Sequence, residues 1–137
     1  MWVEASSEGM TKIRGYFSQI AAIPVAKMVR RKPIHVFEET PVQDILNALY
    51  REHRGVAMVI DKECKLLGIF TERDVLTRLS FTEPEWRQAP VSQFMTREPH
   101  TILGEESLAQ ALKIMEEGAF RHLPIVDQEN RAIGVLS

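Results

Sequence analysis

The chain has 137 residues, of which 45% are hydrophobic and 26% are charged, so it can bury a core the size of one ordinary domain. Its net charge of −2 excludes a global positive field, and we expect neither nucleic acid nor an anionic membrane as a partner. The single cysteine excludes an internal disulfide, and the N-terminus lacks the apolar core of a signal peptide, so we expect a cytoplasmic protein.

Residues 1–24 are predicted to form an N-terminal extension that contains one helix. Apolar side chains within 10–23 recur at intervals of 4, 3 and 1, which places them on one helix face. These side chains are Ile13, Phe17, Ile20 and Ala21. Pro24 ends the pattern, because proline cannot continue a helix.

Residues 25–80 predict the order strand, helix, strand, strand, helix. Strands are expected at 33–36, 56–60 and 66–70, and a polar turn with Cys64 joins the last two. Thr40 is expected to cap the first helix, with Pro41 at its first position, and Thr71 begins the second helix. The first helix has a buried face of Val42, Ile45, Leu46 and Leu49, and the second carries Val75, Leu76 and Leu79.

A linker at 81–90 leads into residues 91–137, where the same order of elements begins again. Ile102 lies in the first expected strand, 107–115 form the helix, and 123–126 and 132–136 form the paired strands. The side chains expected to point inward from this helix are Leu108, Ala111, Leu112 and Met115. The sequence stops at Ser137, where the first repeat begins its last helix. We therefore expect residues 10–23 or a partner chain to cover the face left open.

The two halves match when the sequence is shifted by 66 positions, which lays residues 25–71 over residues 91–137 without a gap. Eight of the 47 pairs are identical, and the apolar pattern also repeats. The identical pairs begin at Val25, Arg31, Pro33, Glu39, Leu46, Asp61, Glu63 and Gly68. Such a repeat predicts two similar units related by a pseudo-twofold axis, with a candidate site in the cleft between them.

The repeated unit resembles the CBS domain, and residues 25–137 resemble a CBS pair, or Bateman module. The motifs that carry the resemblance are GIFTERD at 68–74, FRHLPIVD at 120–127 and GVLS at 134–137, with the openings MVRRKP at 28–33 and FMTREP at 94–99. The resemblance implies an α+β fold of tandem CBS repeats, the second lacking its last helix. It also implies a regulatory module that binds an adenosine-containing ligand, such as AMP, ADP, ATP or S-adenosylmethionine.

Thr71 and Asp74 are the sharpest candidate site residues. From their spacing at a helix start, the hydroxyl and the carboxylate are expected to form a capping box with the helix backbone. The resemblance instead favours ribose binding, in which the carboxylate accepts hydrogen bonds from the ribose hydroxyls. Both roles stay open, since Thr71 can cap a helix and still line a cleft.

By the same resemblance, further side chains are expected around the ligand. Ile69, Met95 and Phe120 are expected to sandwich the purine, and Gly55 lets the ligand approach the backbone. Arg54 and Arg121 are expected to meet phosphate oxygens, although each has the alternative of a solvated side chain. Glu98 and His100 complete the site, with Glu98 a poor neighbour for a polyphosphate. Arg121 and His122 are expected to meet phosphates in a second, incomplete site, whose ribose position is Ser137.

We therefore expect a regulatory module and not an enzyme. The histidines have no close ligand spacing and one cysteine cannot build a zinc site, so neither a metal nor a cofactor is expected. The apolar surface of two α+β halves predicts a homodimer. Two alternatives remain: a ligand-free CBS dimerisation module, and the regulatory fragment of a larger enzyme or transporter.

Overall fold

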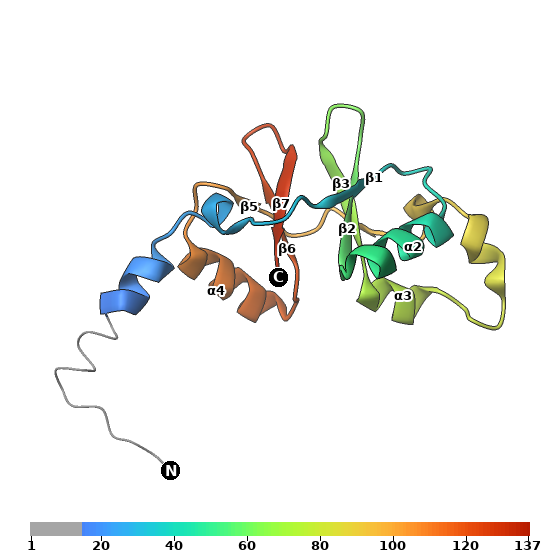
Figure 1. Cartoon of the computed structure of the whole chain (residues 1–137), viewed down its shortest axis with the longest axis horizontal. Coiled ribbons are helices and arrows are strands. Elements are labelled where there is room, and N and C mark those ends of the chain that lie inside the picture. The colour runs from blue at the N-terminus through green and yellow to red at the C-terminus, as the bar shows by residue number, and fades with distance from the viewer. Residues whose placement is uncertain (1–14) are drawn as a thin grey trace, which may run out of the picture.

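The computed structural model describes residues 15–137, which form two small sheets flanked by helices (Figure 1). The first sheet has the strand order β1 (Ile34–Val36), β2 (Val56–Ile60), β3 (Leu66–Thr71) and β4 (Thr96–Arg97), and the second has β5 (Ile102–Leu103), β6 (Leu123–Val126) and β7 (Ala132–Leu136). The helices are α2 (Val42–Glu52), α3 (Glu72–Arg78) and α4 (Leu108–Gly118), with short 3-10 turns η1 (Val25–Met28), η2 (Pro84–Gln88) and η3 (Val91–Gln93). The predicted α+β order is confirmed, and in the described chain a last helix follows only the first repeat.

The two repeats share one strand arrangement. In each, the first strand pairs in parallel with the second, and the second pairs antiparallel with the third. The central strands β2 and β6 are buried along their whole length, because they pair on both sides and are covered on both faces. The two sheets also pack against each other, through a cluster that includes Met58, Ile69 and Val126.

The segments that open the repeats, residues 25–29 and 91–97, are exchanged between them. Val25 is fully buried in the core of the second repeat, and its counterpart Val91 is fully buried in the core of the first. Strand β4, at the end of the second opening segment, pairs with β3 of the first sheet. Neither repeat therefore has a complete core without the opening segment of the other.

Backbone hydrogen bonds of the opening segments follow the same pseudo-twofold relation. The Val25 N–H donates to the Glu106 carbonyl oxygen at 2.8 Å, and the Val91 N–H donates to the matching carbonyl oxygen of Thr40 at 3.0 Å. The next N–H of each segment, of Ala26 and of Ser92, donates to the carbonyl oxygen two residues earlier, of Gly104 and of Glu38 respectively. The exchange is thus held by main-chain contacts as well as by the buried valines.

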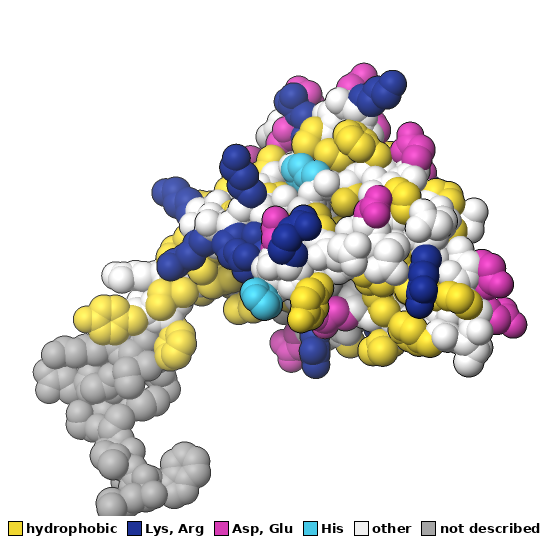
Figure 2. All heavy atoms as spheres, turned by 45° about the vertical axis from the view of Figure 1, so that its right-hand side comes forward, with side chains coloured by type: hydrophobic (Ala, Val, Ile, Leu, Met, Phe, Trp, Pro, Cys, Tyr) yellow, Lys and Arg dark blue, Asp and Glu magenta, His cyan; other side chains and the backbone are white. Residues whose placement is uncertain are grey.

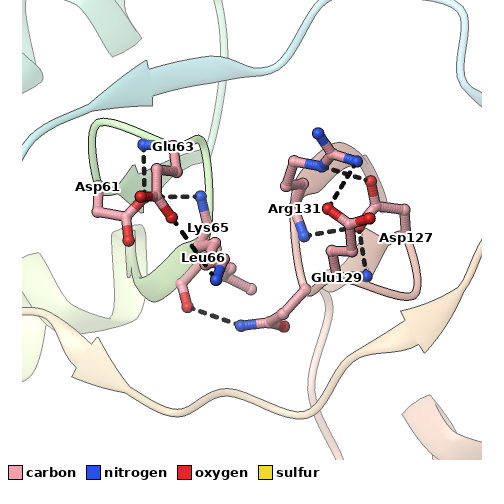
Figure 3. Close-up of polar contacts among 8 residues, drawn as sticks. Asp61, Glu63, Lys65, Leu66, Asp127, Glu129 and Arg131 are labelled. Carbon is pink, nitrogen blue, oxygen red and sulfur yellow. Dashed lines mark hydrogen bonds and ion pairs between the residues drawn. The ribbon is translucent and has the colours of Figure 1, made fainter.

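The turns of the two central hairpins are built alike (Figure 3). Asp61 accepts hydrogen bonds from two backbone N–H groups of its own turn, and Asp127 does the same in the second hairpin. Cys64 and Asn130, at matching positions, both have left-handed backbone, with φ of 67° and 63°. Cys64 lies in this turn as predicted, and its thiol is half-buried.

These two turns also bond to each other. The Leu66 N–H donates to the Asn130 carbonyl oxygen, and the Ala132 N–H donates to the Cys64 carbonyl oxygen, both at 2.9 Å. The Asn130 side chain adds a bond to the Leu66 carbonyl oxygen at 3.2 Å (Figure 3). The pair of main-chain bonds joins the repeats at the tips of their hairpins.

Two apolar surfaces that we expected to be buried are exposed. Residues 15–21 are helical, but Phe17 and Ile20 are 66% and 46% exposed and do not cover the second sheet; Ile13 lies outside the described residues. In α4, Leu112 is 55% exposed, because the helix packs through Ala111 and its neighbours and a step of one residue turns the side chain by about 100°.

The start of α2 also differs from the expectation. Pro41 and not Thr40 is the N-cap residue, and α2 begins at Val42. The Thr40 hydroxyl accepts a hydrogen bond from the Phe37 N–H at 3.0 Å, so it closes the preceding turn. The buried face of α2 is as predicted, with Val42, Ile45 and Leu49 in the core.

The molecular surface is mixed in character. Figure 2 shows Lys and Arg side chains gathered on one part of the face in view, with hydrophobic side chains scattered around them. Within residues 15–137, no helix has the length and apolar character needed to cross a bilayer.

At Gly68, the opening segment of the second repeat approaches β3 so closely that a side chain has no room. A Cβ there would lie 2.6 Å from the Thr96 carbonyl oxygen, which is main chain and cannot move aside. We expect Gly68→Ala to lower the free energy of unfolding by about 1–3 kcal/mol, measured by urea denaturation. Gly15→Ala is the matched control, since its Cβ would meet nothing within 4 Å. Equal stability of the Gly68 variant and the parent would contradict the close approach.

Candidate functional site

A cavity of about 610 Å³ lies between the two repeats, a volume typical of small-molecule sites. The end of β3 and helix α3 form one wall, and residues 96–100 with the loop between α4 and β6 form the other. The lining residues are Ile69, Thr71, Glu72, Arg73, Asp74, Leu76, Thr77, Thr96, Glu98, Pro99, His100, Gly118, Ala119, Phe120, Arg121 and His122.

Asp74 is the one charged side chain that is buried within residues 15–137, at 4% exposure. Its Oδ2 accepts from the Thr71 N–H at 2.9 Å and from the Thr71 hydroxyl at 3.2 Å, while the Thr71 Oγ1 accepts from the Asp74 N–H at 3.4 Å. The predicted capping box is therefore present at the start of α3.

The other oxygen of this carboxylate binds outside the capping box. Asp74 Oδ1 accepts from the Thr96 hydroxyl at 2.9 Å and forms an ion pair with Arg78 Nε at 3.2 Å. Arg78 also donates to the Met95 carbonyl oxygen at 3.0 Å. Asp74 thus connects α3 of the first repeat to the opening segment of the second, and its charge is compensated by Arg78.

The second repeat supplies an aromatic wall. His100 and Phe120 stack with ring centroids 5.3 Å apart and an interplanar angle of 20°. The Phe120 ring lies over Gly118, where a Cβ would collide with it. An aromatic pair of this kind offers a flat apolar surface beside the polar groups of α3.

His122 lines the cavity from the second repeat and also lies close to the first. Its Nδ1 is 2.8 Å from the Ser137 hydroxyl, and its ring lies close to Gly55 of the first repeat. Burial lowers the pKa of His122 below its ordinary value of 6.5; the Glu72 carboxylate opposes this shift and Arg121 adds to it. The imidazole is therefore neutral at pH 7 and can accept or donate a hydrogen bond.

Eight of the twelve predicted site residues line this cavity, namely Ile69, Thr71, Asp74, Glu98, His100, Phe120, Arg121 and His122. Met95 does not, because its side chain packs behind Gly68 in the core of the first repeat. Arg54, Gly55 and Ser137 also lie outside the lining.

The pseudo-twofold relation explains these last three positions. A shift of 66 residues places Arg54 on Phe120, Gly55 on Arg121 and Thr71 on Ser137. Arg54 and Gly55 thus occupy the position equivalent to the lining residues of the other repeat. The Arg54 guanidinium donates to the Lys32 carbonyl oxygen at 2.7 Å.

The polar residues that line the cavity but were not predicted from the sequence include Thr96, and Glu72 and Arg73 in the first turn of α3. Glu72 and Arg73 fall inside the same motif as Thr71 and Asp74, so their position in the helix's first turn was a usable signal. Thr96 lies inside the opening motif at 94–99, between the predicted residues Met95 and Glu98, so its position was a signal too, although the repeat matches it with Arg30. No group of three or more residues able to hold a metal ion occurs in the described part of the chain.

A family model of the CBS domain matches the sequence twice, at residues 25–80 and 91–137. The chain therefore belongs to the CBS domain family. It is 36% identical over 107 residues to the inosine-5'-monophosphate dehydrogenase of Aquifex aeolicus, a match that covers 77% of this chain and 21% of that enzyme. It likewise spans 19% of a CBS domain-containing protein, CBSCBSPB1, of Arabidopsis thaliana.

Solved structures have the same fold. CBSX2 in complex with AMP is similar with a TM-score of 0.73 and 25% identity, over 84% of this chain and 90% of that one. The CBS domain pair of protein MJ0100, in complex with 5'-methylthioadenosine and S-adenosyl-L-methionine, gives a TM-score of 0.74 at 20% identity, over 85% and 90% of the two chains.

The lowered pKa of His122 predicts acid sensitivity. Between this pKa and 6.5 the unfolded chain binds more protons than the folded chain, so the free energy of unfolding falls as pH drops below about 6.5. Burial lowers the pKa of His35 as well, which adds to the slope. Thermal unfolding between pH 7.5 and 5.0 should show a shallower slope for His122→Asn than for the parent, and shallower still with His35→Asn added. An unchanged slope in His122→Asn would contradict the assignment.

Proposed function

We propose that this chain is a regulatory module that binds an adenosine-containing ligand in the cavity between its two CBS repeats. The observation that carries the proposal is the position of Asp74, a buried carboxylate in the wall of a cavity that both repeats line. Ligand in this cavity contacts α3 of one repeat and residues 98–100 of the other, so its binding is coupled to the relative position of the repeats.

The lining offers complementary chemistry for each part of a nucleoside. Asp74 is a strong acceptor for the hydroxyls of a ribose, and the stacked pair of His100 and Phe120 is a surface for a purine. Arg73 and Arg121 line the cavity as positive charges that suit a phosphate, while Glu72 and Glu98 oppose a long polyphosphate chain. This balance favours a ligand with little net negative charge.

The relatives support the same class of ligand. CBSX2 binds AMP, and the domain pair of MJ0100 binds 5'-methylthioadenosine and S-adenosyl-L-methionine. The Aquifex relative is an enzyme in which the matched region is about a fifth of the chain. We propose, on this basis, that the module regulates an enzyme or transporter and performs no chemistry of its own.

The proposal is tested by titrating the chain with adenosine, AMP and S-adenosylmethionine in a calorimeter. Asp74→Asn keeps the shape of the side chain but removes its charge, and we expect it to weaken adenosine binding by about 10- to 150-fold. Asp44→Asn, at an exposed position of α2, is the matched control. A variant at 74 that melts lower but binds adenosine like the parent would show that Asp74 only caps the helix, and absence of binding by the parent would refute the proposal.

A second candidate function, dimerisation without a ligand, is favoured by exposed apolar side chains on the helices. Leu76 of α3 and Leu112 of α4 are 77% and 55% exposed, and Tyr50 of α2 is 84% exposed. Large apolar side chains exposed on the helices of a small protein often mark an interface between copies.

For the same reason we expect light scattering to give twice the chain mass of 15.7 kDa. Leu112→Glu should return the mass to that of one chain, because a charge buried in an interface is costly. Tyr50→Glu tests in the same way whether α2 lies in the interface: if it does, this variant should also have the mass of one chain. A parent mass of one chain over a wide concentration range would contradict dimerisation.

A further inference from the structure

The Asp74 carboxylate is close to saturated with partners. A carboxylate offers about four lone-pair sites, and this one accepts three hydrogen bonds, from the Thr71 N–H, the Thr71 hydroxyl and the Thr96 hydroxyl; its Oδ1 also forms an ion pair with Arg78 Nε. A ribose diol brings two donors to this carboxylate and must therefore displace a donor that is already bound. The cavity has the volume to admit a diol, but the diol competes there with the hydrogen bonds of the chain itself.

We propose that the Thr96 hydroxyl is the donor that a diol displaces, so that Thr96 sets the affinity of the cavity for ribose-containing ligands. This inference rests on the proposed function, because it takes Asp74 as the ribose acceptor. Thr96 acts through Asp74, and in this role it is a positioning residue that competes with the ligand.

The other donors are less free to leave. The Thr71 N–H is main chain at the junction of β3 and α3, and the Thr71 hydroxyl is held by the Asp74 N–H in the capping box. Arg78 is anchored a second time, at the Met95 carbonyl oxygen, and supplies the charge that compensates the carboxylate. Within residues 15–137, the Thr96 hydroxyl makes a single hydrogen bond. It lies in the cavity wall, and rotation about one side-chain bond turns it away from Asp74.

Release of Thr96 has a consequence for the repeats. Thr96 belongs to β4, which pairs with β3 through only two residue pairs, and its side-chain bond to Asp74 is an extra tie between β4 and α3. A ligand that takes over Asp74 Oδ1 removes this tie. Ligand binding in the cavity thereby loosens the attachment of the opening segment of the second repeat to α3.

The test measures adenosine affinity in three variants at position 96. Thr96→Val replaces the hydroxyl by a methyl group of similar size and suits a strand, so we expect it to fold, to melt lower than the parent and to bind adenosine about tenfold more tightly. Thr96→Ser keeps the hydroxyl and should bind like the parent, and Thr96→Ala also tests removal of the hydroxyl if the valine variant does not fold. Thr82→Val makes the matched change in an exposed loop, where the hydroxyl hydrogen-bonds to that of Ser80.

A ligand without the diol separates competition from other effects. The gain in affinity in Thr96→Val should disappear for 2',3'-dideoxyadenosine, which lacks the two hydroxyls that would donate to Asp74. Lower stability together with tighter binding supports the proposal, because a merely structural role would weaken both. If the parent binds adenosine and Thr96→Val binds it equally or more weakly, this inference alone is overturned. If the parent binds none of adenosine, AMP and S-adenosylmethionine, the proposed function is overturned and this inference with it.

Discussion

Val25 and Val91 hold the molecule together because each one fills the core of the repeat that it does not belong to. Burial of a valine side chain stabilises a fold by about 1.5–3 kcal/mol, and here that gain is available only when both repeats are present. The main-chain hydrogen bonds of the two opening segments fix how each segment lies against the other repeat. The stability of each repeat therefore depends on its contact with the other.

The exchange also builds the cavity. Residues of the second opening segment are carried across to the first sheet, where β4 pairs with β3. This places Thr96 against Asp74 and brings Glu98 and His100 opposite α3. Neither wall would face the other in an isolated repeat, so the candidate site is a property of the pair and of the way its segments cross.

Much of this arrangement was accessible from the sequence. The bounds of β6 and β7 follow from apolar runs that end at polar turn residues, and the capping box follows from the spacing of Thr71 and Asp74. These are local signals, in which neighbours along the chain decide the outcome.

Contacts between distant residues were not accessible in the same way. The partners of Asp74 on its second oxygen lie 4 and 22 residues away, and only the folded chain shows that Arg78 and Thr96 converge on it. Met95 was predicted in the ligand site together with its neighbours in the motif, but its side chain packs beside Gly68 in the core of the first repeat. The exposure of Leu112 likewise depends on which side of α4 meets the sheet.

The contact between the hairpin tips shows how two halves can drift apart in sequence and keep their symmetry. Its principal bonds join main-chain groups of Leu66 and Ala132 to carbonyl oxygens of Asn130 and Cys64. Such bonds make little demand on side-chain identity beyond tolerance of a left-handed backbone, so a cysteine serves in one repeat where an asparagine serves in the other. Substitutions can accumulate at these positions without disturbing the axis, and the two repeats are free to acquire different side chains around a shared frame.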